Sequence, residues 1–486
     1  MRNIKENDMK KILFVASECV PFAASGGLGD VIGSLPAALK KEYGDKADIR
    51  VMLPLYGQIG EEYRSQMKFL CRFETPLAWR RQYCGVLSLE KDGITYYFID
   101  NEYYFKRPSL YGSFDDGERF AFFCRSALES LQRIDFIPDI LHAHDWQTAL
   151  CTVYLKYKYG LIPEYCGVKT VFTIHNIQYQ GIYDPAILGD VFDINNTDLH
   201  VVEYGGCINL MKGAIVCADK VSTVSPTYAK EILSPQFSHG LHYVLEQHKG
   251  KLCGILNGID TEYYDPSSDP DIPATYSTRS LKGKRADKAA LQREFGLNED
   301  PAVPVVAVLS RLVDHKGIDL LTYAADDIIG SGVQLAVLGK GDKYYEDYFA
   351  CLAQRYPGRA SVKLVYDKAL AKRVYAGADI FVMPSRSEPC GLAQMIASRY
   401  GAVPVVRETG GLYDSIRDIG FPEGGNGFTF APYSAWELFN AVKRALALYA
   451  DKAAWEKLVK TDMRWDFSWK RSAKQYKKQI YDFKSK

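Results

Sequence analysis

Two basic residues, Arg311 and Lys316, lie in the segment SRLVDHKG, between an apolar run and a helical pattern. The first turn of a helix has unpaired N–H groups and carries a partial positive charge, and nearby cations add charge-assisted hydrogen bonds to phosphate oxygens. The spacing therefore suits a clamp for a diphosphate. Two solvated surface charges would explain the same residues equally well.

A carboxylate, Glu388, lies in PSRSEPCGL, directly after the apolar run 380–383. A carboxylate just beyond a buried strand can accept hydrogen bonds from the hydroxyls of a ribose or a sugar. Cys390 follows two residues later, but no base accompanies it, so we interpret its side chain as packing rather than nucleophilic. The segment ETGGLYD at 408–414 begins a further helix whose N–H groups could contact a phosphate.

A glycine-rich segment, SGGLGD at 25–30, separates the first apolar run from the first helical pattern. Glycines at such a junction allow backbone N–H groups to approach a phosphate at the start of the helix. The same glycines would fit a tight turn with a purely structural role equally well. This loop alone does not decide between the two interpretations.

Histidines end two of the apolar runs: His142 and His144 the run at 140–144, and His175 the run at 169–174. An H-x-H pair can bind a metal in hydrolases, but no further set of metal-like ligands accompanies it. The pattern favours a polar strand end in which His144 binds a substrate hydroxyl. The D-x-D pattern at 269–271 lies in a predicted connection, so we do not interpret it as a metal site.

These residues need a scaffold of strands and helices in alternation. Apolar runs of strand length alternate with patterns of helical spacing, which predicts an α/β fold with mostly parallel sheets. The pattern stops at 264–280, rich in Asp, Pro and Ser, and begins again at 303. The predicted strands are 11–16, 49–53, 94–99, 140–144, 169–174 and 220–224, then 303–310, 334–338, 362–366, 380–383 and 403–406; the predicted helices include 31–40, 120–131 and 318–329.

We therefore predict two doubly wound, Rossmann-like domains, 1–262 and 263–462, and a C-terminal helix, 463–486, that packs back on the first. In such sheets ligands bind beyond the carboxyl ends of the strands, where the strand order reverses. Two domains of this kind that face each other would form a deep cleft. The catalytic residues are expected there.

Composition excludes several classes of protein. The formal net charge is +1, from 60 basic and 59 acidic residues, so no overall field favours nucleic acid or a membrane surface. The 11 cysteines include no C-x-x-C pattern, which favours reduced thiols over a disulfide framework. No apolar run approaches the roughly 18 residues that cross a membrane. We expect a soluble, cytoplasmic protein.

Beyond these features, the chain resembles the bacterial glycogen synthases and plant starch synthases, ADP-glucose-type α-1,4-glucan synthases with the GT-B fold. The resemblance rests on ordered motifs from about residue 11 to 470: SGGLGDVIGSLP, RPSLYG, HAHDWQ, VFTIHNIQYQG, VSPTYAKEI, GILNGID, SRLVDHKGIDL, PSRSEPCGLAQM, VRETGGLYD and DFSW. It implies an ADP-glucose donor, an α-1,4-glucan acceptor and no metal or other cofactor. It implies no nucleic-acid or membrane partner.

The resemblance also implies roles for particular residues. Arg311 and Lys316 would neutralise the leaving diphosphate, Glu388 would hold the donor glucose, and His144 would bind near its 6-OH group; these four form the implied catalytic set. The implied donor-binding residues are Ser25, Gly26, Gly27, Asp30, Asp145, Asn257, Cys390, Gly391, Leu392, Thr409, Gly410 and Gly411.

One residue departs from the family pattern. Family members usually carry Lys-Thr-Gly-Gly-Leu in the first loop, and here Ala24 and Ser25 precede the two glycines. The missing cation would be worth about 1.5–3 kcal/mol as a charge-assisted contact. Two alternatives therefore stay open: a GT-B transferase with another donor such as UDP-glucose, and a catalytically silent protein that binds glucan or nucleotide.

Overall fold

The computed structural model describes residues 9–483, which divide into two compact units. Unit 1 comprises residues up to Val224, Ala229–Ile255 and the segment from Trp469 onward; unit 2 comprises Ser225–Tyr228 and Leu256–Ser468. Each unit contains its own sheet and its own apolar core. No helix among the described residues is both long and apolar enough to span a bilayer.

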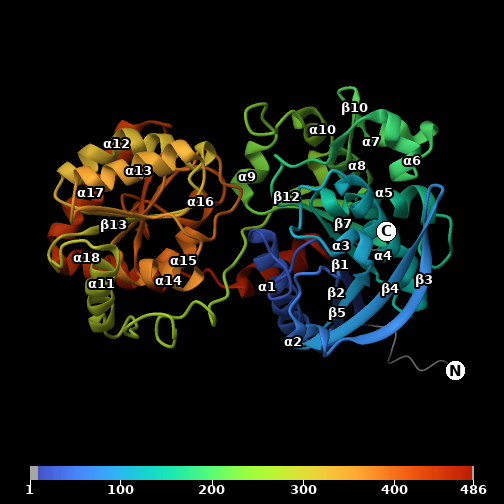
Figure 1. Ribbon diagram of the computed structural model, residues 1–486, viewed down its shortest axis with the longest axis horizontal. Helices are drawn as coiled ribbons and strands as arrows, with labels where there is room; N and C mark the ends of the chain where they lie inside the picture. The colour runs from blue at the N-terminus through green and yellow to red at the C-terminus, as the bar shows by residue number, and fades with distance from the viewer. Residues whose placement is uncertain (1–8, 484–486) are drawn as a thin grey trace. The chain divides into compact units, whose positions relative to one another are not determined.

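Unit 1 is built on a nine-stranded sheet in the order β12-β11-β7-β6-β1-β2-β5-β4-β3 (Figure 1). The strands are β1 (Lys10–Val15), β2 (Ala47–Pro54), β3 (Lys68–Leu77), β4 (Arg80–Lys91), β5 (Ile94–Asp100), β6 (Ile140–His144), β7 (Lys169–Ile174), β11 (Lys220–Thr223) and β12 (Leu252–Gly254), with β8 (Ile182–Tyr183), β9 (Glu203–Tyr204) and β10 (Cys207–Asn209) in a small second sheet. In the nine-stranded sheet all pairs are parallel except β3–β4 and β4–β5, and both pairs of the small sheet are antiparallel. The strand order reverses between β1 and β6, so a ligand site is expected beyond their carboxyl ends.

Helices cover this sheet because its central strands are apolar on both faces. Ile12 to Val15 are all fully buried, as parallel strands between two helical layers require. The helices of this region are α1 (Gly27–Tyr43), α2 (Glu61–Arg64), α3 (Glu102–Phe105), α4 (Asp116–Arg133), α5 (Ala149–Tyr154), α6 (Leu188–Phe192), α7 (Leu199–Val202), α8 (Leu210–Cys217), α9 (Pro226–Glu231) and α10 (His242–Gln247).

The C-terminal segment was predicted as one helix from residue 463, and the structure divides it. Helix α18 (Lys452–Met463) ends there, and α19 (Trp469–Gln475) begins after a short non-helical stretch and continues as a π-helical turn, Tyr476–Ile480. Helix α19, red in Figure 1, packs beside α1. Lys10 Nζ donates to the carbonyl oxygen of Tyr481 at 2.8 Å, so the segment belongs to unit 1.

Unit 2 contains a parallel six-stranded sheet in the order β15-β14-β13-β16-β17-β18. The strands are β13 (Val305–Leu309), β14 (Gln334–Leu338), β15 (Ala360–Lys363), β16 (Ile380–Met383), β17 (Val403–Arg407) and β18 (Phe428–Phe430), and the helices α11 (Lys282–Phe295), α12 (Ile318–Gly330), α13 (Lys343–Arg355), α14 (Lys368–Gly377), α15 (Ala393–Arg399), α16 (Gly410–Ser415) and α17 (Ala435–Ala450). Helices α12 and α13 cover one face, and α11, α14 and α15 the other (Figure 1). The order reverses between β13 and β16.

The segment 264–280, interpreted from sequence as an interdomain connection, is folded onto unit 2. The carboxylates of its D-x-D pattern both accept from Lys372 Nζ, Asp269 at 3.1 Å and Asp271 at 2.9 Å. Tyr400 Oη also donates to Asp269, whose side chain is fully buried. These contacts explain the D-x-D pattern by packing and charge pairing within unit 2.

Candidate active site

Two loops at the reversal point of unit 2 carry the predicted clamp. Arg311 lies two residues beyond β13 and is exposed, and Lys316 ends a short 3-10 turn, Asp314–Lys316, that Gly317 separates from α12. Lys316 Nζ is 2.6 Å from Glu388 Oε2, in the loop that follows β16. Ser385 Oγ donates to the same carboxylate oxygen at 3.1 Å. A cation and a carboxylate that can bind phosphate and sugar groups thus meet at this edge.

A glycine with a left-handed backbone allows these two loops to approach each other. Gly317 has φ of +72°, and a Cβ atom there would lie 2.0 Å from the carbonyl oxygen of Pro384. The backbone N–H of Arg386 donates to the carbonyl of His315 at 2.9 Å and joins the loops again. Any side chain at 317 would push the carboxylate of Glu388 away from the ammonium of Lys316.

The glycine pair beyond β17 allows its backbone to approach the loop that contains Glu388. Cβ atoms at Gly410 and Gly411 would lie 2.0 and 2.1 Å from the carbonyl oxygens of Glu388 and Cys390. The N–H of Gly411 donates to the Glu388 carbonyl at 3.1 Å. That N–H group, which the sequence suggested for a phosphate, is therefore bound to protein. Thr409 is the N-cap residue of α16 and is fully buried, and Gly391 (φ of +71°) and Leu392 precede α15.

Asn257 and Cys390 lie together behind this edge. Both are buried, and burial raises the pKa of the Cys390 thiol to about 12, an effect that hydrogen bonds with Asn257 oppose. A neutral thiol is a poor nucleophile, which agrees with a packing role for Cys390. The amide oxygen of Asn257 is buried with no hydrogen-bond partner among the described residues, so it remains able to accept a bond from a ligand.

In unit 1, His144 lies at the carboxyl end of β6, beside the reversal point. Its Nδ1 is 3.0 Å from His175 Nε2, and its ring stacks on Phe14 with centroids 5.5 Å apart. Burial lowers the pKa of His144 well below its ordinary value, so the ring is neutral. Its Nε2 is buried and has no partner within residues 9–483. This nitrogen is available to a substrate hydroxyl.

His142 has a different environment. Its Nδ1 is 2.7 Å from the Tyr481 hydroxyl, and its Nε2 is 2.6 Å from Thr173 Oγ1. Both ring nitrogens are occupied by protein partners, so neither is placed to bind a metal. No cluster of three His, Cys, Asp or Glu side chains with metal-site geometry occurs in the part of the chain that the structure describes.

Asp145 follows His144 in a strained backbone conformation, with φ of +56° and ψ of 179°. Residues other than glycine rarely adopt this region, and such strain is concentrated at functional sites. The carboxylate accepts from the N–H groups of His175 at 2.8 Å and Asn176 at 3.4 Å. Burial nevertheless raises the pKa of Asp145 to about 7. The carboxyl group can therefore change protonation state near neutral pH.

The glycine loop of unit 1 is tied to the end of β1. The N–H groups of Ser25 and Gly26 both donate to Glu18 Oε2, at 2.7 and 3.0 Å. Helix α1 begins at Gly27, and Asp30 lies in its first turn. A Cβ atom at Gly29 would lie 2.4 Å from the Cβ of Ala24, so the loop folds tightly on itself.

Both halves of the chain match known families of sugar-transferring proteins. Residues 11–247 match the starch synthase catalytic domain family, and residues 287–461 match the family of glycosyl transferases group 1. The chain is 47% identical over 475 residues to a glycogen synthase of Geobacillus thermodenitrificans, covering 97% of both chains, and 48% identical over 469 residues to one of Ligilactobacillus salivarius, covering 96% of this chain and 98% of that one. The chain belongs to the glycogen and starch synthase family.

Two solved structures have a fold similar to that of this chain. The catalytic domain of starch synthase IV from Arabidopsis thaliana, bound to ADP and acarbose, superposes with a TM-score of 0.89 at 34% identity, covering 97% of this chain and 98% of that one. Sucrose-phosphate synthase from Thermosynechococcus elongatus gives a TM-score of 0.60 at 18% identity, with the same coverage, and shows the fold alone. This glycogen and starch synthase family member is thus a glycosyltransferase with the GT-B fold.

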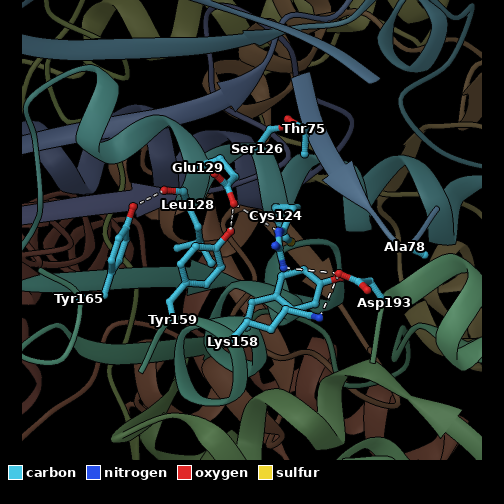
Figure 2. Close-up of polar contacts among 12 residues, drawn as sticks. Thr75, Ala78, Cys124, Ser126, Leu128, Glu129, Lys158, Tyr159, Tyr165 and Asp193 are labelled. Carbon is cyan, nitrogen blue, oxygen red and sulfur yellow. Dashed lines mark hydrogen bonds and ion pairs between the residues drawn. The ribbon is translucent and has the colours of Figure 1, made fainter. Parts of the chain in front are cut away.

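A small hollow of about 20 Å³ lies elsewhere in unit 1, and Lys158 and Asp193 of a charged cluster on α4 and the segment that follows α5 are among the residues that line it. Figure 2 shows Lys158 pointing to Asp193 (3.0 Å) and the Tyr159 hydroxyl donating to Glu129. Arg125 lies between Glu129 and Asp193, at 3.6 and 3.5 Å. The two cations and two carboxylates balance in charge and brace α4, although Nε and Nη1 of Arg125 make no hydrogen bond within residues 9–483.

The structure brings together the predicted residues of unit 2, Lys316, Glu388, Gly410 and Gly411, and within unit 1 it places His144 next to Asp145. Sequence reasoning did not single out Ser385 or Glu18. Each lies just beyond a strand at a reversal point, at β16 and β1 respectively, and that position was the signal available.

Proposed function

We propose that this glycogen and starch synthase family member transfers glucose from ADP-glucose to the nonreducing 4-OH of an α-1,4-glucan, with retention at the anomeric carbon. The observation that carries the proposal is the contact of Lys316 with Glu388 at the reversal point of unit 2. The ammonium group of Lys316 would bind the diphosphate, and the carboxylate of Glu388 would bind the glucose hydroxyls. The name of the matched glycogen synthases, and the ADP and acarbose bound to starch synthase IV, support the donor and acceptor.

Arg311 and Lys316 would stabilise the negative charge that grows on the diphosphate as the glycosidic bond breaks. A cation aimed at developing charge lowers the barrier more than it tightens substrate binding. In a front-face reaction the leaving phosphate takes the proton of the acceptor hydroxyl, so no second carboxylate is required. Glu388 would bind hydroxyls of the donor glucose, and the free Nε2 of His144 would bind its 6-OH.

Two further side chains and three segments complete the proposed donor site. The unpartnered amide oxygen of Asn257 would accept a hydroxyl proton, and Asp145 would lie next to the glucose. The segments that contain Cys390–Leu392 and Thr409–Gly411 would line the diphosphate and sugar region. The 25–30 loop would form the wall of unit 1.

A donor panel tests the proposal. The protein is incubated with radiolabelled ADP-, UDP- or GDP-glucose and glycogen, and the labelled polymer is digested with β-amylase, which releases maltose from nonreducing α-1,4 ends. We expect ADP-glucose to give the highest kcat/KM and the label to appear in maltose. If UDP-glucose gives the highest kcat/KM, the proposed donor is wrong and UDP-glucose takes its place. If no donor gives incorporation, the result supports a catalytically silent homologue, an alternative that only Ala24 favours.

A further inference from the structure

Glu18 lies at the carboxyl end of β1, and four groups donate to its side chain. Oε2 accepts from the N–H groups of Ser25 and Gly26, at 2.7 and 3.0 Å. Oε1 accepts from Ser25 Oγ at 2.8 Å and from the Tyr111 hydroxyl at 2.7 Å. The side chain is 4% exposed, so the carboxylate exchanges nearly all of its water for these bonds.

The N–H groups of Ser25 and Gly26 form an anion-binding arrangement, and the carboxylate of Glu18 already occupies it. Consecutive N–H groups in front of a helix are the usual ligands of a phosphate oxygen. Here the Glu18 carboxylate takes the N–H groups of Ser25 and Gly26, so the loop's first two donors do not meet a ligand phosphate. Charge-assisted bonds of this kind are about twice as strong as neutral ones, so they hold the loop firmly.

The same carboxylate joins three segments that are distant in the sequence. Tyr111, in the segment between α3 and α4, donates to Glu18 and is 2.8 Å from the hydroxyl of Ser17. Glu18 thus fixes the end of β1, the 25–30 loop and the Tyr111 segment at one point. That point lies at the reversal of strand order, where β1 and β6 also position His144 and Asp145.

We propose that Glu18 is a positioning residue for the donor: it holds the 25–30 loop in the shape that receives the nucleotide diphosphate, without touching the substrate. The inference rests on the proposed function for the identity of the donor. The absence of a lysine at 24 makes this role more important, because the loop has no cation of its own to orient it on the diphosphate. Rigid placement of the loop then determines donor binding.

The test compares Glu18→Ala and Glu18→Gln with Asp219→Ala, a matched control. Asp219 Oδ2 also accepts from a backbone N–H and a hydroxyl, those of Thr170 at 2.8 and 3.0 Å, but at the amino end of β7. Donor KM, acceptor KM, kcat and the Kd for ADP are measured for each. We expect Glu18→Ala to raise donor KM and ADP Kd about tenfold or more, because the loop loses the four bonds that fix its shape.

Glu18→Gln keeps the shape and is expected to recover about half of that loss on a logarithmic scale, while acceptor KM changes less than twofold in every variant. Ser25→Ala should weaken ADP binding in the wild type and add nothing in Glu18→Ala, because the two act as one unit. Equal effects of Glu18→Ala and Asp219→Ala on ADP Kd would overturn the inference. Because ADP Kd requires no turnover, this result is independent of a failed donor panel.

Discussion

Lys316 Nζ lies 2.6 Å from Glu388 Oε2, so the lysine that is proposed to bind the diphosphate is paired with the carboxylate that is proposed to hold the sugar. If Lys316 binds the diphosphate as proposed, the diphosphate must compete with Glu388 for the ammonium group. Donor binding would then include an exchange of partners at Lys316. The ion pair keeps the lysine oriented and its charge compensated until the donor arrives.

This exchange predicts opposite effects of one substitution on binding and rate. Glu388→Gln releases Lys316, so the affinity for ADP should rise about threefold to tenfold, while kcat falls about 100-fold or more because the glucose loses its partner. ADP Kd by calorimetry and kcat by label incorporation check this. Glu294→Gln, which breaks the pair with Arg373 elsewhere in unit 2, is the control. Weaker ADP binding in Glu388→Gln would contradict the exchange.

Ala24→Lys is expected to lower the KM for the donor by about tenfold, since it restores a cation worth about 1.5–3 kcal/mol next to the diphosphate. Ala302→Lys, in an exposed turn of unit 2, adds the same charge at a remote place and should leave KM unchanged. Kinetics with ADP-glucose at fixed ionic strength separate the two. Unchanged kinetics for Ala24→Lys would mean that this chain binds the donor without a lysine there.

The raised pKa of Asp145, about 7, predicts a pH dependence of stability. An Asp whose folded pKa exceeds its unfolded value contributes stability below the unfolded pKa and loses it as the pH rises through the folded pKa. The free energy of unfolding should therefore fall between pH 4 and 7 through this group. Asp145→Asn removes that slope and should be more stable than the wild type at pH 8 by about 4 kcal/mol, at roughly 1.4 kcal/mol per unit of the raised pKa. Denaturant unfolding of the wild type and of Asp145→Asn at pH 4, 6 and 8 measures the free energy of unfolding. If this free energy depends on pH in the same way in both proteins, the pKa of Asp145 is ordinary.

His142 and His144 should respond differently to substitution. His142→Ala breaks the bonds to Tyr481 and Thr173, so it should destabilise the protein by about 2–3 kcal/mol and change kcat/KM less than threefold. His144→Ala removes the nitrogen available to the substrate, so kcat/KM should fall about 100-fold. Thermal unfolding and kinetics on both variants check the contrast. A large kinetic effect of His142→Ala without loss of stability would count against it.

Lys372→Ala should destabilise the protein by about 3 kcal/mol, because it leaves the buried carboxylate of Asp269 without its cation. Lys343→Ala, in an exposed pair with Asp347, should change the stability much less, because solvent screens that pair. Activity of the wild type should survive a chelator, since both carboxylates of the D-x-D pattern bind Lys372. Urea unfolding and an assay in EDTA are the measurements. Activity that a chelator abolishes would point to a metal elsewhere.

The sequence predicted the central strands well because they are short apolar runs buried on both faces, as at Ile12–Val15. It missed the hairpin β3–β4, where Phe69 and Tyr83 are exposed and the alternation of a half-buried strand is irregular. It placed Arg311 and Lys316 in the loop after β13 and Glu388 in the loop after β16, as the structure has them, since loop position follows from strand position. It could not reveal that Glu18 occupies the glycine loop, because that contact depends on the folded path of the loop.

The segment that begins at Trp469 adds a consequence for the order of synthesis. Tyr481 supplies the buried hydroxyl that binds His142, and α19 packs on α1, so the core of unit 1 lacks these parts until the segment from Trp469 onward has been translated. Unit 2 has all its strands before that segment. Unit 1, whose strands are translated first, is therefore completed after unit 2, and apolar surface left uncovered during such a delay is the kind that chaperones recognise.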